Sequence, residues 1–219
     1  MKFKTIYDIN DYENKLVLLR CDFNVPIKDG EIKDDSKIVK SLETISYLNL
    51  NNAKLVITSH LGKIKSQEDK KDNNMKFVFE ELAKYFDCPL FFCDSLEKEK
   101  IDEYKKTLKK GEILVLQNTR FDEGEVKNDP TFSSTLGNMV DIYVMDAFGS
   151  IHRNHSSTTG VCSFLKNEKK DRVIGSLVLE ELKALNHCIE DIKRPYISIV
   201  GGKKISDKIQ VIEGLLEKS

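Results

Sequence analysis

The fold is decided by a strand end and the loop that follows it, Asp146-Ala147-Phe148-Gly149-Ser150-Ile151-His152-Arg153-Asn154-His155-Ser156-Ser157. The apolar run Val140–Met145 precedes this loop, and its β-branched and aromatic residues predict a buried strand. A polar loop at a strand end lies at the carboxyl edge of the sheet, where open α/β sheets bind ligands. Two imidazoles, a guanidinium and several hydroxyls are mostly donors, which favours an anionic ligand. The ordinary alternative is a solvated loop whose side chains cap the next element.

Length and charge limit the functions that the chain can have. Its 219 residues allow one large domain, or one domain and part of another. The formal net charge of -1 argues against a nucleic-acid partner, because such proteins usually carry a basic excess. No signal peptide is visible, and no run approaches the roughly 18 apolar residues of a membrane span. We therefore expect neither nucleic acid nor membrane as a partner, and any anion site must be a local concentration of cations.

The cysteines show no paired spacing of the kind that metal sites use. They number five and are Cys21, Cys88, Cys93, Cys162 and Cys188. We expect free, buried thiols in a reducing cytoplasm, and no metal site on this chain. Two tracts rich in lysine, glutamate and asparagine, Ser66–Asn74 and Glu97–Lys110, are interpreted as solvated faces and loops.

The remaining apolar runs alternate with helical patterns. Further strands are expected at Leu16–Leu19, Lys54–Thr58, Leu90–Cys93 and Glu112–Leu116. Helices are expected from Ser36 as N-cap through Leu48, around Lys76–Phe86, and near Leu96–Leu108. This alternation predicts right-handed βαβ units and a parallel sheet, and so an α/β fold.

Polar side chains follow four of the predicted strands. They are Asp22 and Asn24, His60 and Lys63, Arg120, and finally His152, Arg153 and His155. Because the carboxyl ends of parallel strands meet at one edge, these groups are expected to converge. Lys37 lies at the start of a predicted helix, where the helix dipole disfavours a cation. That position is weak support for a ligand-binding role, and a solvated lysine is the ordinary alternative.

Residues 179–219 begin with a predicted helix, Leu179–Ile192, which Arg194-Pro195 ends. A predicted strand, Tyr196–Val200, then leads into Gly201-Gly202-Lys203-Lys204-Ile205-Ser206-Asp207-Lys208 and a further helix. A strand, a glycine pair and a helix start can cradle a phosphate. The stretch matches neither the P-loop nor the dinucleotide-binding pattern, so the signal is weak by itself.

Together, these motifs resemble phosphoglycerate kinase. The resemblance covers essentially the whole chain and rests on six stretches: Arg20-Cys21-Asp22-Phe23-Asn24-Val25-Pro26, Ser59-His60-Leu61-Gly62, Asn118-Thr119-Arg120-Phe121, Asp146-Ala147-Phe148-Gly149, His152-Arg153-Asn154-His155 and Gly201–Lys208. It implies a three-layer, Rossmann-like parallel sheet over residues 1–178 that binds 3-phosphoglycerate. It implies that residues 179–219 are an interdomain helix and the incomplete opening βα unit of a second, nucleotide-binding α/β domain.

The resemblance also implies the roles of individual residues. The substrate ligands would be Asp22, Phe23, Asn24, Lys37, His60, Leu61, Gly62, Lys63, Arg120, His152 and Arg153. Nucleotide contacts would come from Gly201, Gly202, Lys204 and Lys208. Lys37 and Lys204 would be catalytic, and His155 resembles the second of two neighbouring family histidines. The implied glycolytic reaction transfers a phosphoryl group between 1,3-bisphosphoglycerate and ADP, giving 3-phosphoglycerate and ATP. It needs Mg²⁺, whose ligands are expected in the second half of such an enzyme.

The sequence departs from the family pattern at four places. Lys37 and Lys63 stand where the family usually has arginine, and lysine keeps the charge but loses the guanidinium fork. Gln117 replaces a usual glutamate, and a usual proline is missing near Ile64. The chain is also about half as long as a family member. We expect a cytoplasmic monomer that is inactive by itself. The alternative is a degenerate, non-catalytic domain that binds a phosphorylated acid or a protein partner.

Overall fold

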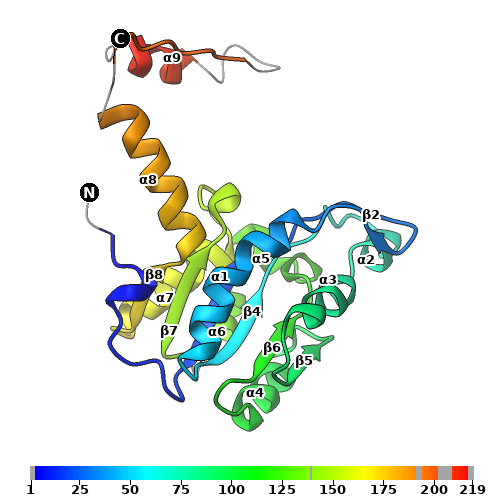
Figure 1. Ribbon diagram of the computed structural model, residues 1–219. Helices are drawn as coiled ribbons and strands as arrows, with labels where there is room; N and C mark the ends of the chain where they lie inside the picture. The colour runs from blue at the N-terminus through cyan, green and yellow to red at the C-terminus, as the bar shows by residue number, and fades with distance from the viewer. Residues whose placement is uncertain (1–2, 139, 191–193, 202–208, 217–219) are drawn as a thin grey trace. The chain divides into compact units, whose positions relative to one another are not determined.

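The computed structural model describes residues 3–138, 140–190, 194–201 and 209–216 (Figure 1). The chain divides into two compact units, Met1–Val178 and Leu179–Ser219. The first unit contains the sheet that the alternating pattern predicts. The second contains α9 (Ile209–Leu216) and all but the first three residues of α8 (Ser176–Glu190). Among the described residues, no helix combines the length and the apolar character needed to cross a bilayer.

The first unit is built on a six-stranded, fully parallel sheet. Its strands are β1 (Leu16–Cys21), β4 (Lys54–Thr58), β5 (Leu90–Cys93), β6 (Ile113–Leu116), β7 (Ile142–Asp146) and β8 (Asp171–Ile174), in the spatial order β5-β6-β4-β1-β7-β8. The expected α/β fold with a parallel sheet is thus confirmed. The central strand β1 pairs with β4 on one side and β7 on the other.

Helices cover both faces of the sheet and give three layers (Figure 1). The helices that contribute to the two cores are α1 (Ser36–Leu50), α3 (Lys76–Leu82), α4 (Lys98–Thr107), α6 (Pro130–Gly137) and α7 (Val161–Asn167). Two short helices, α2 (Gln67–Asp72) and α5 (Gly124–Lys127), lie in the connections after β4 and β6. Val17 and Leu19 of β1 join the core under α1 and α3, whereas Leu16 and Leu18 join the core under α4, α6 and α7. This alternation is the period of a strand buried on both faces.

A small antiparallel hairpin, β2 (Ile27–Lys28) and β3 (Glu31–Ile32), follows β1. Its turn residues Asp29 and Gly30 both have positive φ, 55° and 75°, as a two-residue hairpin turn requires. The tight turn expected from Asp-Gly is therefore present.

Several local expectations need correction. Ser36 is the first helical residue of α1 and not its N-cap, because Asp35 occupies that position and the Asp34 carboxylate accepts from the Ser36 N–H. Tyr196–Val200 forms no strand in the part of the chain that the structure describes, although its apolar pattern predicts one. A parallel strand needs a neighbour to satisfy its backbone groups, and the sheet of the first unit includes no strand from this segment.

Lys105 is the clearest exception to the expectation that Glu97–Lys110 is solvated. Its side chain is buried under α6. The ammonium donates to three backbone oxygens at the C-terminal end of α6, those of Thr135, Leu136 and Asn138, at 3.1, 3.2 and 2.8 Å. A cation at a helix C-terminus is favoured by the helix dipole and satisfies carbonyls that lack helical partners.

Candidate anion-binding site

Two pairs of neighbouring strands send their connections to opposite faces of the sheet. The connection after β1 leads to α1 on one face, and that after β7 leads to α7 on the other. The connections after β4 and β6 diverge in the same way, to α3 and α6. Ligands bind where adjacent connections diverge, because the strand ends are open there. The four polar tips expected from the sequence all lie at these two openings.

The tips after β1 and β4 are joined by a direct hydrogen bond. The Asn24 side-chain oxygen accepts from the Gly62 N–H at 2.8 Å. Gly62 has a φ of +57°, and a Cβ at this position would lie 1.9 Å from the Asn73 Oδ1. Only glycine fits here without displacing Asn73, so the backbone of this tip is held close to Asn24. Asp22 lies beside Asn24, and its Oδ1 is 3.3 Å from the Lys37 Nζ.

The tip after β6 is fixed by Asn118, whose side chain is buried. Its oxygen accepts from the backbone N–H groups of Leu61 and Arg120, each at 3.1 Å, and its amide donates to the Leu61 carbonyl at 2.7 Å. Arg120 in turn donates from NH1 to the Gly62 carbonyl. Its Nε is buried without a protein partner, so this guanidinium keeps one unsatisfied donor at the sheet edge.

Gln117, which replaces a usual family glutamate, fits the buried position that it occupies. Its side-chain oxygen accepts from the N–H groups of Met75 and Asn118 at 2.9 and 2.8 Å, and its amide donates to Asn74 at 3.1 Å. The bonds to Met75 and Asn74 hold the β6 tip against the start of α3.

His60 links the β4 tip to the β7 tip. The ring is buried between two guanidinium groups, with Nδ1 3.0 Å from the Arg20 NH2 and Nε2 3.4 Å from the Arg153 NH1. Burial, and then the positive charges of Arg20, Arg120, Arg153 and Lys37, lower the pKa of His60 to about 2. The imidazole is therefore neutral, and the positive charge of the site resides on arginine and lysine.

Sequence reasoning missed a buried set of polar groups beneath these tips. Arg20 is 1% exposed and donates from Nε to the Ser157 Oγ at 2.8 Å. Ser157 donates to the buried Glu125 carboxylate from its hydroxyl at 2.7 Å and from its N–H at 2.9 Å. His155 lies 3.7 Å from the same carboxylate, and burial lowers the pKa of its imidazole. The available signal in the sequence was an arginine, Arg20, within an apolar strand. A buried charge needs partners, so this arginine could have indicated a buried polar network.

The residues that the resemblance implies as ligands differ in burial and in position. Phe23 and Leu61 have buried side chains in the core beneath α1 and α3, so they can offer a ligand only their backbone groups. Lys63 and His152 are exposed. Gly201 belongs to the second unit, and Gly202, Lys204 and Lys208 lie outside the described residues.

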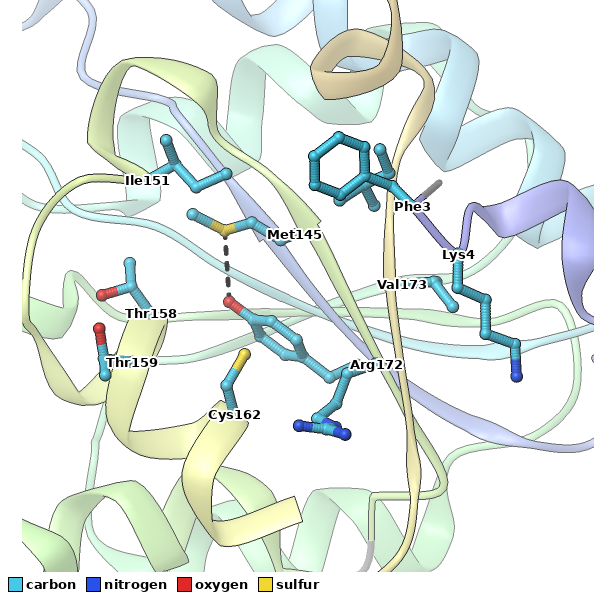
Figure 2. A pocket seen from close by; sticks show the side chains of 11 residues that line it. Phe3, Lys4, Met145, Ile151, Thr158, Thr159, Cys162, Arg172 and Val173 are labelled. Carbon is cyan, nitrogen blue, oxygen red and sulfur yellow. Dashed lines mark hydrogen bonds between the residues drawn. The ribbon is translucent and has the colours of Figure 1, made fainter. Parts of the chain in front are cut away.

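A separate pocket of about 390 Å³ lies beside the β7 and β8 strands (Figure 2). Its lining is mainly apolar, and the Tyr143 hydroxyl bonds to the Met145 sulfur at 3.3 Å within it. Lys4 and Arg172 are its charged lining residues, and Lys4 is paired with Asp171. It therefore lacks the clustered cations of the sheet edge.

The arrangement defines an α/β protein with a cluster of cationic side chains, a candidate ligand site, at the carboxyl edge of a parallel sheet. A family model described as phosphoglycerate kinase matches residues 6–219. The chain therefore belongs to the phosphoglycerate kinase family.

Individual relatives agree with this family assignment. The chain is 45% identical to a phosphoglycerate kinase of Finegoldia magna over 220 residues, which are 100% of this chain and 54% of that protein. It is 41% identical to one of Lactobacillus acidophilus over 223 residues, 99% of this chain and 55% of that protein. The solved structure of phosphoglycerate kinase from Coxiella burnetii matches with a TM-score of 0.83 at 33% identity, covering 99% of this chain and 52% of that one. The chain thus spans about half the length of the relatives that it matches.

Proposed function

We propose that residues 1–178 are the 3-phosphoglycerate-binding domain of a phosphoglycerate kinase. The proposal is supported above all by the convergence of His60, Arg120, Arg153 and Lys37 at one sheet edge, beside Asp22 and Asn24. The substrate has a carboxylate and a phosphate that carries about -1.5 to -2 charges. Guanidinium groups bind both through paired, charge-assisted hydrogen bonds. Asp22 and Asn24 can accept from the substrate hydroxyl.

In the complete enzyme, the reaction would be phosphoryl transfer between 1,3-bisphosphoglycerate and ADP, a step of glycolysis in the cytoplasm. Such catalysis consists mainly of positioning and charge stabilisation. Lys37 and Lys204 would stabilise the transferring group, and Gly201, Gly202 and Lys208 would contact the nucleotide. Residues 179–219 would be the connecting helix and the opening segment of the nucleotide-binding domain.

Bound Mg²⁺ would supply charge neutralisation between the phosphates. Within the described ranges, no three His, Cys, Asp or Glu side chains gather as a metal site would require. We propose that the metal ligands belong to the other half of the enzyme. We also propose that the protein is a monomer that binds no nucleic acid.

Binding of 3-phosphoglycerate to the 219-residue chain, without nucleotide, tests the proposal. A ligand that binds only the folded state raises the melting temperature by mass action. Titration calorimetry should show one site, and affinity should fall as salt is added, because ion pairing drives binding. Glycerate, which lacks the phosphate, is the matched control and should bind far more weakly. Absence of both heat and a melting shift at millimolar 3-phosphoglycerate in low salt would contradict the proposal.

An assay of phosphoryl transfer distinguishes the proposed enzyme half from the non-catalytic alternative, a degenerate binding domain. This alternative is favoured by Lys37 and Lys63, which replace two fork-shaped donors with point charges. We propose that the chain alone transfers no phosphate, and that adding a separately produced second half restores transfer. Binding of 3-phosphoglycerate without restored transfer would favour the degenerate domain. ATP formation by the chain alone would require a complete nucleotide site within it.

A further inference from the structure

The buried side of the site contains a chain of hydrogen bonds whose direction can be assigned from the chemistry of the groups and the lengths of their contacts. A guanidinium has only donors, so the Arg20 Nε donates to the Ser157 Oγ, and the serine hydroxyl proton points to the Glu125 Oε1. Arg20 NH1 donates to the Cys21 carbonyl. The NH2 group then faces the Nδ1 of His60 at 3.0 Å. A neutral imidazole can accept at only one nitrogen, and guanidinium donors face both nitrogens of His60. The Arg20 contact is the shorter of the two, 3.0 Å against 3.4 Å, and joins two buried side chains, so Nδ1 accepts from Arg20 and carries no proton.

The other ring nitrogen follows from this assignment. A neutral imidazole carries one proton, so the proton of His60 lies on Nε2. Nε2 is 3.4 Å from NH1 of Arg153, which is also a donor. Two donors facing each other at this distance form no hydrogen bond between them. They can both donate to a third atom, and the atom that suits them is an anionic oxygen of a ligand.

We propose that Arg20, held in place by Ser157 and Glu125, is a positioning residue that fixes His60 as the Nε2–H tautomer, so that His60 and Arg153 donate together to one oxygen of the bound acid. The inference rests on the proposed function for the identity of that acid. The tautomer itself does not depend on it. Arg20 is buried in β1 and reaches the ligand only through His60.

The surroundings of His60 keep this state independent of pH. The charged groups that act on the ring are Arg20 from β1, Arg120 after β6, Arg153 after β7 and Lys37 from α1, and all four are positive. Burial and these charges hold the pKa of His60 far below neutrality. The acid at the end of this chain of hydrogen bonds is Glu125, and it contacts Ser157 and His155 and not His60. His60 therefore serves as a fixed donor and not as an acid or base.

Nitrogen-15 NMR of the 219-residue chain tests the inference directly. The side-chain shifts distinguish a protonated from an unprotonated ring nitrogen, and the His60→Gln variant assigns the signal. Without any ligand, His60 should show a protonated Nε2 and an unprotonated Nδ1, unchanged from pH 5.5 to 8. A protonated Nδ1, or titration of the ring in this range, would overturn the proposal. This readout is independent of whether 3-phosphoglycerate binds, so failure of the proposed function would be recognised separately by calorimetry.

Two variants test the role of Arg20. Arg20→Met in a Glu125→Gln background removes both buried charges together, which avoids an isolated carboxylate. Arg20→Lys keeps the charge but replaces three donor nitrogens with one. Each should leave His60 a mixture of tautomers and weaken 3-phosphoglycerate binding about tenfold, while circular dichroism shows a folded chain. Arg172→Met, on β8, removes a guanidinium from the same sheet and should change neither quantity more than twofold. If the double variant does not fold, Arg20→Lys decides; an unchanged His60 tautomer in the folded variant would overturn the role of Arg20.

Discussion

The candidate site has a buried part and an exposed part that are built differently. Arg20, His60, Ser157 and Glu125 form the buried part, where each polar group is bonded to another within the protein. Lys37 and Lys63 form the exposed part, and Lys37 pairs with the largely buried carboxylate of Asp22 at 3.3 Å. Lys37 has 45% of its side chain exposed. The buried part is thus organised by the fold, whereas the exposed part is free to adjust to a ligand.

This difference follows from the cost of burying charge. A buried guanidinium is tolerated only with satisfied donors and a compensating acid, so Arg20, Ser157 and Glu125 depend on one another. An exposed ammonium keeps its water and contributes little when it pairs. Substitutions in the buried part should therefore change stability, and substitutions in the exposed part should change only binding.

The largest effect is expected from Glu125→Leu, which breaks the buried part. The variant leaves Arg20 without its compensating acid and leaves two donors of Ser157 unpaired. Loss of one partner of a buried charged network costs about 3–5 kcal/mol of unfolding free energy. Urea unfolding followed by circular dichroism measures it. Lys37→Ala is the matched control and should change the unfolding free energy by less than about 0.5 kcal/mol. Equal effects of the two variants would contradict the distinction.

Arg153→Ala tests the boundary between the two parts. Arg153 is half-buried, its guanidinium faces His60 at 3.4 Å, and no carboxylate of the described residues forms an ion pair with it. We expect 3-phosphoglycerate to bind about 1.5–3 kcal/mol more weakly, the scale of a hydrogen bond to a charged group. The unfolding free energy should change little. Calorimetry measures the first quantity and urea unfolding the second; a variant that loses its fold would place Arg153 in the buried part.

The comparison also explains how much could be predicted from the sequence. The strands β4 and β5 were predicted with their observed bounds, because buried parallel strands are short apolar runs. β8 was missed, since this edge strand has the charged residues Asp171 and Arg172 at its start. Tyr196–Val200 was wrongly predicted as a strand, because an apolar pattern carries no information about whether a neighbouring strand exists.

The same limit applies to the site. The exposed and half-buried residues were predicted, and so was the buried His60, because polar groups after a strand are visible as a pattern. Arg20 and Glu125 were not predicted, because the residue that joins them, Ser157, is far from both in the sequence. It lies 137 residues from Arg20 and 32 residues from Glu125. Lys105 was assigned to a solvated tract for the same reason, because its three carbonyl partners lie 30 to 33 residues away along the chain. Sequence patterns report local periodicity, and buried polar contacts depend on the tertiary fold.

A pH effect on stability should come from the buried groups at the strand ends, and Asp146 is its expected source. Burial raises the pKa of the Asp146 carboxyl from 3.8 to about 6, although its Oδ1 accepts from the Val178 N–H at 3.2 Å. The folded state then binds a proton more tightly than the unfolded state between about pH 4 and 6, so stability falls as pH rises through this range. The unfolding free energy of the native chain minus that of Asp146→Asn should fall from about pH 4 to about pH 6 and stay constant above that. A difference that rises with pH would contradict the assignment.

The smallest effect is expected from Lys37→Arg, a change confined to the exposed part. Lys37 lies in the first turn of α1 and contacts Asp22 through one nitrogen. An arginine keeps the charge and adds a fork that can bind a carboxylate or phosphate through two nitrogens. Because the position is exposed, solvent screens the gain, and we expect affinity for 3-phosphoglycerate to stay within about threefold, which is roughly 0.6 kcal/mol, with an increase favoured. Calorimetry at low and at high salt measures it, with Lys40→Arg on the same helix as the control for a general charge effect. A tenfold loss would show that the exposed part is built around the ammonium of Lys37, and that it is as rigid as the buried part beside it.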